Sequence, residues 1–316
     1  MATPSGPSEP FRFRRLGKPE EFRQVEEVQR AAFGTREEST LPPPIQRAMQ
    51  DNGGLVLGAF VDIHLVGFAL GFLGWDGQRL YHYSHMTAVR PEYQNHRVGY
   101  RLKGYQREEV AAMGLEEIRW TFDPLQSKNA RLNVRYLGGR PTSYLPHYYG
   151  RLDDAVNASL ETDRLLLRWS IQSPEVVARL EGRVPTPDED VARWTVSSAI
   201  VTTEPGESGI RVPTEVAEPT GEAAHLEIPF DLDLVRQHEP KALWRWRHAV
   251  RDAFRAAYDL DYVVEDFATI RSDHERRSFY LLRKLPPTNR EDPATAPLDP
   301  PLGPSVGAAP SDRTSG

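Results

Sequence analysis

The segment from His85 to Leu102 holds the residue types in this chain that are best suited to chemistry. An apolar stretch ends at Val89, a polar turn follows, and a helical pattern begins near Val98. The first turn of a helix presents unpaired N–H groups and the positive end of the helix dipole, which together bind anions. Gly99 leaves room for an anion at the backbone, and arginines stand on both sides of it. The turn from 94 to 100 therefore predicts a pyrophosphate site, although an ordinary strand-to-helix turn with a glycine has the same pattern.

The elements around this turn follow from the spacing of apolar residues and from Gly and Pro at their ends. In the first half of the chain they are expected in the order β-α-α-β-β-β-α-β-α-β, which predicts a mixed sheet with helices on both faces. The expected strands are 11–16, 55–61, 65–75, 80–89, 118–122 and 165–171, and the expected helices are 19–33, 45–50, 98–113 and 129–137.

The second half of the sequence predicts a linker followed by a smaller C-terminal subdomain. Residues 172–222 are rich in Pro, Glu, Thr and Gly, and only short strands are expected there, at 199–203 and 210–212. Residues 223–285 predict a β-α-β-β subdomain, whose helix spans 241–258 with apolar residues on one face. Residues 1–10 and 286–316 are rich in proline and lack a core-forming pattern, so we expect them to be disordered. A Pro-rich docking ligand is the alternative for the second of these.

Composition and charge exclude several classes of protein. The chain has 39 basic and 45 acidic residues, and its net charge of −6 argues against a nucleic-acid partner. The absence of cysteine excludes a disulfide scaffold, a thiolate nucleophile and any Cys-ligated metal. No apolar run is long enough to span a membrane, and the first ten residues lack the pattern of a secretory signal. We therefore expect a cytoplasmic protein, and its Ala, Arg and Pro richness fits a GC-rich bacterial source.

The element order and the turn together resemble the GNAT superfamily of N-acyltransferases. The phosphate-binding pattern of that family is Gln or Arg, two variable residues, Gly, one variable residue, then Gly or Ala. Gln94 and Gly99 match it, whereas Arg97 stands where the family has its first glycine. The preceding run from Ala88 to Gln94 matches the family's strand exit. This resemblance covers residues 11–171, about half of the chain.

Further strings resemble a group of predicted, poorly characterised GNAT proteins of about this length. The fold that the resemblance implies is α/β, with a mixed, largely antiparallel sheet, a V-shaped splay and helices on both faces. The smaller C-terminal β-α-β-β subdomain looks like the closing part of the same fold without a phosphate turn. The matching strings are Trp120–Leu125, Asn129–Ala130, Leu132–Asn133, Leu137–Gly138, Tyr144–Pro146, Tyr148–Gly150 and Thr162–Arg164.

The resemblance implies an acyl-CoA co-substrate, most simply acetyl-CoA, and no metal. Acyl-CoA is expected in a gap between the strands 80–89 and 118–122, with its pyrophosphate on N–H groups of the turn. Asn129 is expected to add one hydrogen bond to the co-substrate. The residues implied in binding are Thr87, Ala88, Val89, Gln94, Asn95, His96, Arg97, Val98, Gly99, Tyr100 and Asn129.

A general base and a general acid are needed for direct attack of a neutral amine on the thioester. For the base the candidates are His85 and Asp123, and strand alternation puts Tyr83 and His85 on one side and His82, Ser84 and Met86 on the other. For the acid, Tyr136 lies seven residues after Asn129, as in the family. A second register, aligned on Leu137-Gly138, puts Val134 there instead, and Tyr148 and Tyr149 are alternatives. A strand-surface position for each histidine and a turn role for Asp123 stay open, as does a water chain in place of any of these groups.

The acceptor is expected to be a small-molecule primary amine, and the nearest family hint is an amino acid. Arg247 and Arg251 lie one turn apart on the predicted helix and could hold a carboxylate of the acceptor or of a succinyl group, or could simply be solvated. Two alternatives remain: an amino-acid N-succinyltransferase that uses succinyl-CoA, and a non-catalytic acyl-CoA-binding protein of the same fold. The sequence leaves a homodimer open and names no nucleic-acid or membrane partner.

Overall fold

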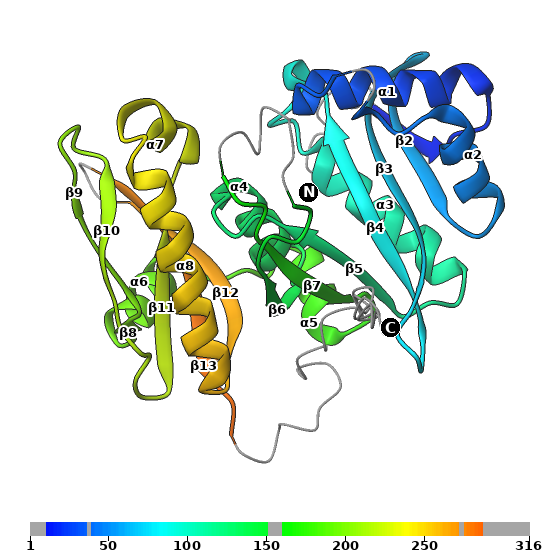
Figure 1. Ribbon diagram of the computed structural model, residues 1–316. Helices are drawn as coiled ribbons and strands as arrows, with labels where there is room; N and C mark the ends of the chain where they lie inside the picture. The colour runs from blue at the N-terminus through cyan, green and yellow to red at the C-terminus, as the bar shows by residue number, and fades with distance from the viewer. Residues whose placement is uncertain (1–10, 37–38, 151–159, 272–274, 287–316) are drawn as a thin grey trace, which may run out of the picture.

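A seven-stranded sheet forms the first half of the molecule (Figure 1). The computed structural model describes residues 11–36, 39–150, 160–271 and 275–286. Neighbouring strands in this sheet are antiparallel except β4 and β5, which run parallel. The strand order is β1-β2-β3-β4-β5-β7-β6, with β1 at Phe11–Arg15, β2 at Leu55–Val61, β3 at His64–Trp75, β4 at Leu80–Val89, β5 at Glu117–Phe122, β6 at Arg140–Leu145 and β7 at Arg164–Ser170.

Helices cover both faces of this sheet, because alternate strand residues point to opposite sides. In β2, Val56 and Phe60 pack with α1 (Pro19–Phe33) and α2 (Pro43–Asp51). Leu55, Leu57 and Ala59 belong instead to the apolar cluster that contains α3 (Val98–Ala112). The predicted fold class, a mixed α/β sheet that is largely antiparallel and has helices on both faces, is confirmed.

Two elements of this half differ from expectation. The helix expected at 129–137 is α4 (Ser127–Ala130) followed by a π-helix at Arg131–Tyr136. Strand β6 was not predicted, since Pro141 interrupts its pattern. It is the edge strand of the sheet, where a proline is tolerated because no ladder hydrogen bond is lost.

A second, four-stranded sheet follows, in the order β12-β13-β11-β8. The expected β-α-β-β order is present as β11, α8, β12 and β13. Helix α8 buries Leu243, Trp246, Val250, Phe254 and Ala257, the face that the sequence predicts. A separate hairpin, β9–β10, lies between β8 and β11 in the chain. The bounds are β8 Ser198–Ala199, β9 Val201–Pro205, β10 Arg211–Val216, β11 Ala223–Ile228, α7 Leu232–His238, α8 Ala242–Asp259, β12 Tyr262–Arg271 and β13 Arg276–Lys284.

The segment expected to be a linker contains two helices, α5 (Pro174–Leu180) and α6 (Pro187–Thr195). Each begins with a proline after a capping residue. The Ser173 hydroxyl accepts from the Val176 N–H, and Thr186 forms a capping box with Glu189. These start signals are local and lie in a Pro-rich stretch, which is why composition alone suggested a linker.

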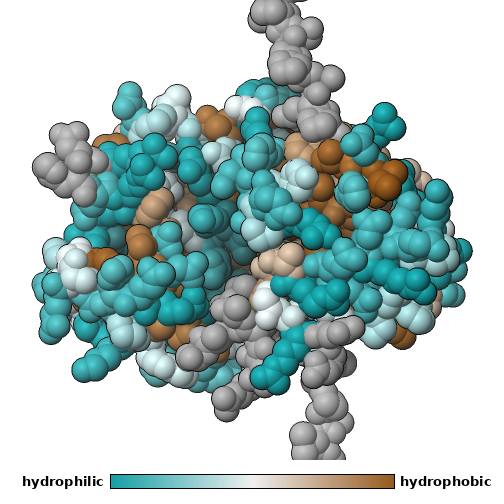
Figure 2. Space-filling model, turned by 90° about the horizontal axis from the view of Figure 1, so that it is seen from above, coloured by the Kyte–Doolittle hydropathy of each residue, from teal (hydrophilic) through white to brown (hydrophobic). Residues whose placement is uncertain are grey.

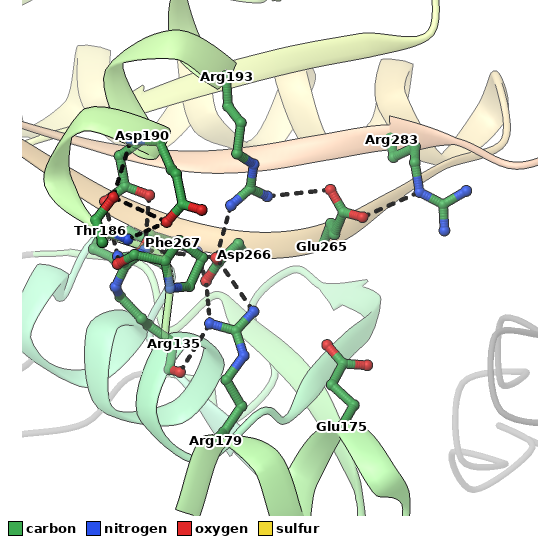
Figure 3. Close-up of polar contacts among 12 residues, drawn as sticks. Arg135, Glu175, Arg179, Thr186, Asp190, Arg193, Glu265, Asp266, Phe267 and Arg283 are labelled. Carbon is green, nitrogen blue, oxygen red and sulfur yellow. Dashed lines mark hydrogen bonds and ion pairs between the residues drawn. The ribbon is translucent and has the colours of Figure 1, made fainter. Parts of the chain in front are cut away.

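The two sheets share one apolar core and a buried ionic joint. One cluster of buried residues runs from Leu55 in β2 to Leu282 in β13. Asp266 of β12 is fully buried and contacts three guanidiniums, those of Arg135, Arg179 and Arg193, which come from the π-helix, α5 and α6 (Figure 3). The second sheet is therefore fixed to the first.

The surface seen from above is mostly hydrophilic, with smaller hydrophobic areas (Figure 2). No helix in the described ranges is long and apolar enough to cross a membrane. The disorder expected for residues 1–10 and for the tail beyond 286 concerns residues outside the described ranges.

Candidate active site

A β-bulge at His85 shapes the centre of the first sheet. In the β3–β4 ladder Gly71 pairs with Ser84 and Leu70 pairs with Met86, so His85 is the extra residue. A bulge bends its strand and increases the twist. The parallel ladder to β5 has only two pairs, the last being Tyr83 with Arg119, and the strands then diverge toward their C-terminal ends (Figure 1). The β4 backbone from 85 to 89, including Thr87, Ala88 and Val89, therefore keeps an edge that β5 does not pair.

The bulge also corrects the expected alternation along β4. His82 and Ser84 contact Gln106 of α3 through hydrogen bonds, whereas Met86 packs with the α1 cluster on the opposite face. Met86 therefore does not share a side with His82 and Ser84, because the extra residue reverses the alternation at that point.

Tyrosines and a histidine meet on the face of the sheet opposite α3. The rings of Tyr83 and His85 lie 6.3 Å apart between centroids, and Phe72 of β3 packs beside both, at 5.4 and 6.0 Å. The loop after β6 brings Tyr148 and Tyr149, whose centroids are 4.7 Å apart. The Tyr149 hydroxyl lies 3.1 Å from Thr121 Oγ1 of β5. We call Phe72, Tyr83, His85, Thr121, Tyr148 and Tyr149 the tyrosine cluster.

Desolvation shifts the pKa values of the histidine and of the tyrosines in opposite directions. It lowers the pKa of His85, which favours the neutral imidazole at neutral pH. It raises the pKa of Tyr148, and it raises that of Tyr83, to which the neighbouring Tyr149 adds. His85 is nevertheless exposed to solvent. A neutral imidazole that solvent reaches can accept a proton, and phenols that stay protonated can donate one.

The turn before α3 has the geometry of an anion site. Asn95 and Arg97 adopt left-handed backbone conformations, with φ of 66° and 58°, and Arg97 is the N-cap of α3. No side chain caps this end, so the first N–H groups of the helix lack an intrahelical partner. A Cβ added at Gly99 would meet only Val89 Cγ2, at 3.9 Å. Residues 94–97 of this turn are exposed, whereas Val98 is buried at the start of the helix. The free N–H groups of the turn could hold a pyrophosphate.

Polar side chains hold the turn to its surroundings. Gln94 Nε2 donates to the Val89 carbonyl at 3.2 Å, and His96 Nδ1 lies 3.0 Å from the Gln94 carbonyl. The Tyr100 hydroxyl donates to the Leu180 carbonyl at the end of α5. The segment after β7 therefore lies against the turn, which the sequence did not suggest.

A buried polar network lies behind β4, on the α3 side. Lys103 Nζ donates to Ser84 Oγ at 2.9 Å and to Gln106 Oε1 at 3.0 Å, and it sits 3.7 Å from the Trp120 ring centroid. Burial lowers the pKa of Lys103 to about 7. Burial, with the Lys103 charge, lowers the pKa of His82 to about 3, and His82 Nδ1 has no hydrogen-bond partner. These groups are on the other side of the sheet from His85.

The two arginines and the aspartate expected at the site all form ion pairs within the chain. Arg247 donates two hydrogen bonds to Asp123, at 2.9 and 2.7 Å, and Asp123 also accepts from the Leu125 N–H. Arg251 donates to both oxygens of Asp163, each at 2.8 Å, and to Glu161. Neither guanidinium is therefore left for a carboxylate of the acceptor, and the geometry favours His85 over Asp123 as the base.

Two further predicted residues lie on the helical segment after β5. Tyr136 is on the π-helix, with the Arg131 guanidinium 5.5 Å from its ring centroid. Asn129 is exposed on α4. Sequence reasoning underrated Tyr83, Thr121 and Tyr149, and the alternation Tyr81-Tyr83-His85 in β4 was the signal that pointed to the first of them.

One group of side chains resembles a metal site in composition. His147, Glu161 and Asp163 each place a ligand atom within 4.8 Å of the others. Arg251 already contacts both carboxylates and offsets part of their charge.

The chain is similar to several solved acetyltransferase structures. The ribosomal-protein-S18-alanine N-acetyltransferase of Escherichia coli is 15% identical, with a TM-score of 0.42 over 52% of this chain and 95% of that chain. The aminoglycoside 6'-acetyltransferase type Ii is 18% identical, with a TM-score of 0.42 over 51% and 97%. The NatC complex bound to Gag peptide and CoA is 16% identical, with a TM-score of 0.41 over 51% of this chain and 99% of that chain. Among curated proteins, none matches this sequence.

The family comparison covers the strands and helices just described. Residues 22–138 match the model of the Acetyltransferase (GNAT) family, from α1 through β4, the α3 turn and β5 to the end of the π-helix. The bulge, the splay of β4 from β5 and the exposed turn all lie within this match. The chain therefore contains a domain of the GNAT acetyltransferase family.

Proposed function

We propose that this protein transfers an acetyl group from acetyl-CoA directly to a primary amine of a small molecule. The observation that carries the proposal is the position of the exposed His85, with the tyrosine cluster around it, beside the strand splay. The anion turn at α3 lies at the end of β4 toward which the splay opens. A chain that binds CoA at that turn would bring the thioester into reach of the tyrosine cluster.

Each residue then has a defined task. The N–H groups at the start of α3 bind the pyrophosphate, and the unpaired edge of β4 at 87–89 pairs with pantetheine. A backbone N–H of β4 stabilises the charge that develops on the thioester oxygen. His85 accepts the proton of the attacking amine, and Tyr148 donates a proton to the departing thiolate of CoA. Acetyl-CoA supplies the acyl group, and the other reactant is the neutral amine.

A direct assay tests this function. Acetyl-CoA is offered with a panel of amino acids, an aminoglycoside and a peptide with a free N-terminus, and release of the CoA thiol is measured. We expect turnover with at least one amine and a loss of roughly 10²-fold or more in His85→Gln. His64→Gln, at an exposed histidine at the start of β3, is the matched control. Tight acetyl-CoA binding without turnover across the panel would instead favour the non-catalytic acyl-CoA-binding alternative. A succinyl donor has no support from Arg247 or Arg251, since both are paired.

A further inference from the structure

The loop that carries Tyr148 and Tyr149 is held by backbone hydrogen bonds to one short segment. The His147 N–H donates to Asp163 Oδ1, the Tyr148 N–H to the Thr162 carbonyl and the Tyr149 N–H to Thr162 Oγ1, each at 3.1 Å. His147 has a φ of 51°, a left-handed conformation that is strained for a non-glycine residue. Such a conformation persists only where its surroundings fix it, so Thr162 and Asp163 determine where the two tyrosines point.

Asp163 in turn depends on the C-terminal half of the chain. It is fully buried and accepts from the Tyr144 hydroxyl at 2.7 Å as well as from the His147 N–H. Its two-point partner is Arg251 of α8, which also contacts Glu161 two residues before. A buried carboxylate needs such a partner, because an unpaired buried charge is strongly destabilising. Helix α8 thus completes the support of the loop from outside the GNAT sheet.

Arg247, one turn earlier on α8, makes the matching contact on the other side. It pairs with Asp123, directly after β5, and β5 carries Thr121 of the tyrosine cluster. The two guanidiniums therefore connect α8 to the residues just after β5 and just before β7. Both donate to carboxylates and not to residues of the tyrosine cluster in these hydrogen bonds.

We infer that Arg251 is a positioning residue for the proposed acyl transfer: through Asp163 it holds the loop that presents Tyr148 and Tyr149 to the strand splay. The C-terminal half is thereby part of the active machinery without contacting the reacting atoms. This inference deepens the proposed function and rests on it for the catalytic consequence, while the loop geometry can be tested separately.

Hydrogen exchange at the amides of residues 147–149 tests the geometry without any turnover. In Arg251→Gln we expect exchange at these amides to be at least tenfold faster, while the amides of α3 stay as protected as in the unchanged protein. Arg251→Lys keeps the charge but loses the planar guanidinium, and we expect its exchange rates to lie between those of Arg251→Gln and the unchanged protein. Arg255→Gln, at an exposed arginine one turn further on α8, is the control. Unchanged exchange at 147–149 in both Arg251 variants would overturn the inference.

Kinetics separate positioning from general destabilisation. With the best amine of the panel, Arg251→Gln is expected to lower kcat at least tenfold and to leave the dissociation constant of acetyl-CoA unchanged. Combined with Tyr148→Phe it should add little to the loss that Tyr148→Phe causes alone, because both act through the same hydroxyl. Additive losses would overturn the inference. Absence of transfer by the unchanged protein would refute the proposed function, and the exchange result would still decide the loop geometry.

Discussion

The two sheets contain four-stranded units that pair their strands in the same way but differ in what connects the parallel strands. The first unit is β4-β5-β7-β6 and the second is β8-β11-β13-β12. In each, the parallel ladder has two residue pairs and the remaining ladders are antiparallel. In each, the last strand is bulged, between Pro141 and Ser143 in one and between Val264 and Asp266 in the other. The connection is α3 in the first unit and the β9–β10 hairpin in the second.

This difference shows that the same strand pairing can occur with or without a helix start beside the parallel strands. An anion site of this type needs the free N–H groups of a helix start, and only the first unit connects its two parallel strands through an α-helix. The second unit uses its bulged strand for another purpose. Asp266, just past the bulge, points into the joint with the first sheet and meets three arginines (Figure 3).

The largest expected effect comes from breaking that joint. Asp266→Ala would leave Arg135, Arg179 and Arg193 around a buried site without their shared carboxylate. We expect the free energy of unfolding to fall by about 3–5 kcal/mol, measured by chemical denaturation. Asp252→Ala on exposed α8 surface should change it by less than ~0.5 kcal/mol. Equal stability of the two variants would mean that the units are held by apolar packing alone.

The second prediction tests the asymmetry in cofactor binding. Gly99→Glu puts a carboxylate at the helix start, where it repels a pyrophosphate. We expect acetyl-CoA to bind at least about 100-fold more weakly by calorimetric titration, close to 2.7 kcal/mol. The fold should be kept, because a Cβ at 99 meets only Val89 Cγ2, at 3.9 Å, which is an ordinary contact. Gly104→Glu is the control, since it adds the same charge beyond the first turn and its Cβ meets nothing within 4 Å. Full affinity in folded Gly99→Glu would place the cofactor elsewhere.

The third prediction concerns the pH dependence of stability that comes from Lys103 in the first unit. The pKa of Lys103 is about 7 in the folded protein, below its ordinary 10.5. Between these values the unfolded chain binds a proton that the folded chain does not, so unfolding free energy rises with pH by up to about 1.4 kcal/mol per unit. Lys103→Met should flatten the rise between pH 7 and 9, and Ser84 can still donate to Gln106. An unchanged slope in this variant would assign the dependence to other groups.

The corresponding buried base of the second unit acts in another pH range. His225 of β11 lies between Ser197 and the Trp194 indole N–H, and burial lowers its pKa to about 4. The part of the unfolding free energy that comes from neutral His225 is therefore lost as pH falls from about 6.5 to 4, since the unfolded chain binds the proton first. His82 of the first unit, whose pKa is lowered to about 3, contributes in the same direction over an overlapping acid range. Melting curves of Lys103→Met should therefore retain an acid loss to which both histidines contribute.

The smallest expected effect concerns the end of the second unit. Residues 287–316 contain no aromatic residue and many prolines, so a chain that stops after Pro286 should melt at the same temperature as the full chain. Stopping after Lys284 also removes the bond from the Leu285 N–H to the Asp261 carbonyl, which should cost about 0.5–1.5 kcal/mol. If the chain that stops after Pro286 melted at a lower temperature than the full chain, the tail would contribute to the fold.

The sequence predicted the first sheet well because periodicity and end signals are local. Strands β1 to β5 and helices α1 and α3 lie within a few residues of expectation. The motif also predicted the turn before α3, since Gly99 and its flanking arginines lie within five residues; that this turn binds an anion stays a prediction. The bulge at His85 could not be predicted, because it depends on how β3 pairs with β4 and leaves no mark in the alternation of residue types.

Long-range partners explain the rest of the difference. Arg247 and Arg251 look like a binding face in sequence, yet each meets a carboxylate about 90 residues or more away in the chain. Asp123 was a candidate base for the same reason: nothing near it in sequence shows that Arg247 takes both its oxygens. Residue type fixes what a group can do, and only tertiary contact shows which groups remain free to do it.

The shared apolar core ties the energetics of binding to the whole chain. Because buried residues from β2 to β13 form one cluster, neither sheet can lose its packing without exposing the other's core. We therefore expect unfolding to be one cooperative transition, in which a ligand bound only at the α3 turn would stabilise residues as distant as β13. At a concentration one hundred times its dissociation constant, acetyl-CoA would add about 2.7 kcal/mol to the stability of both units together.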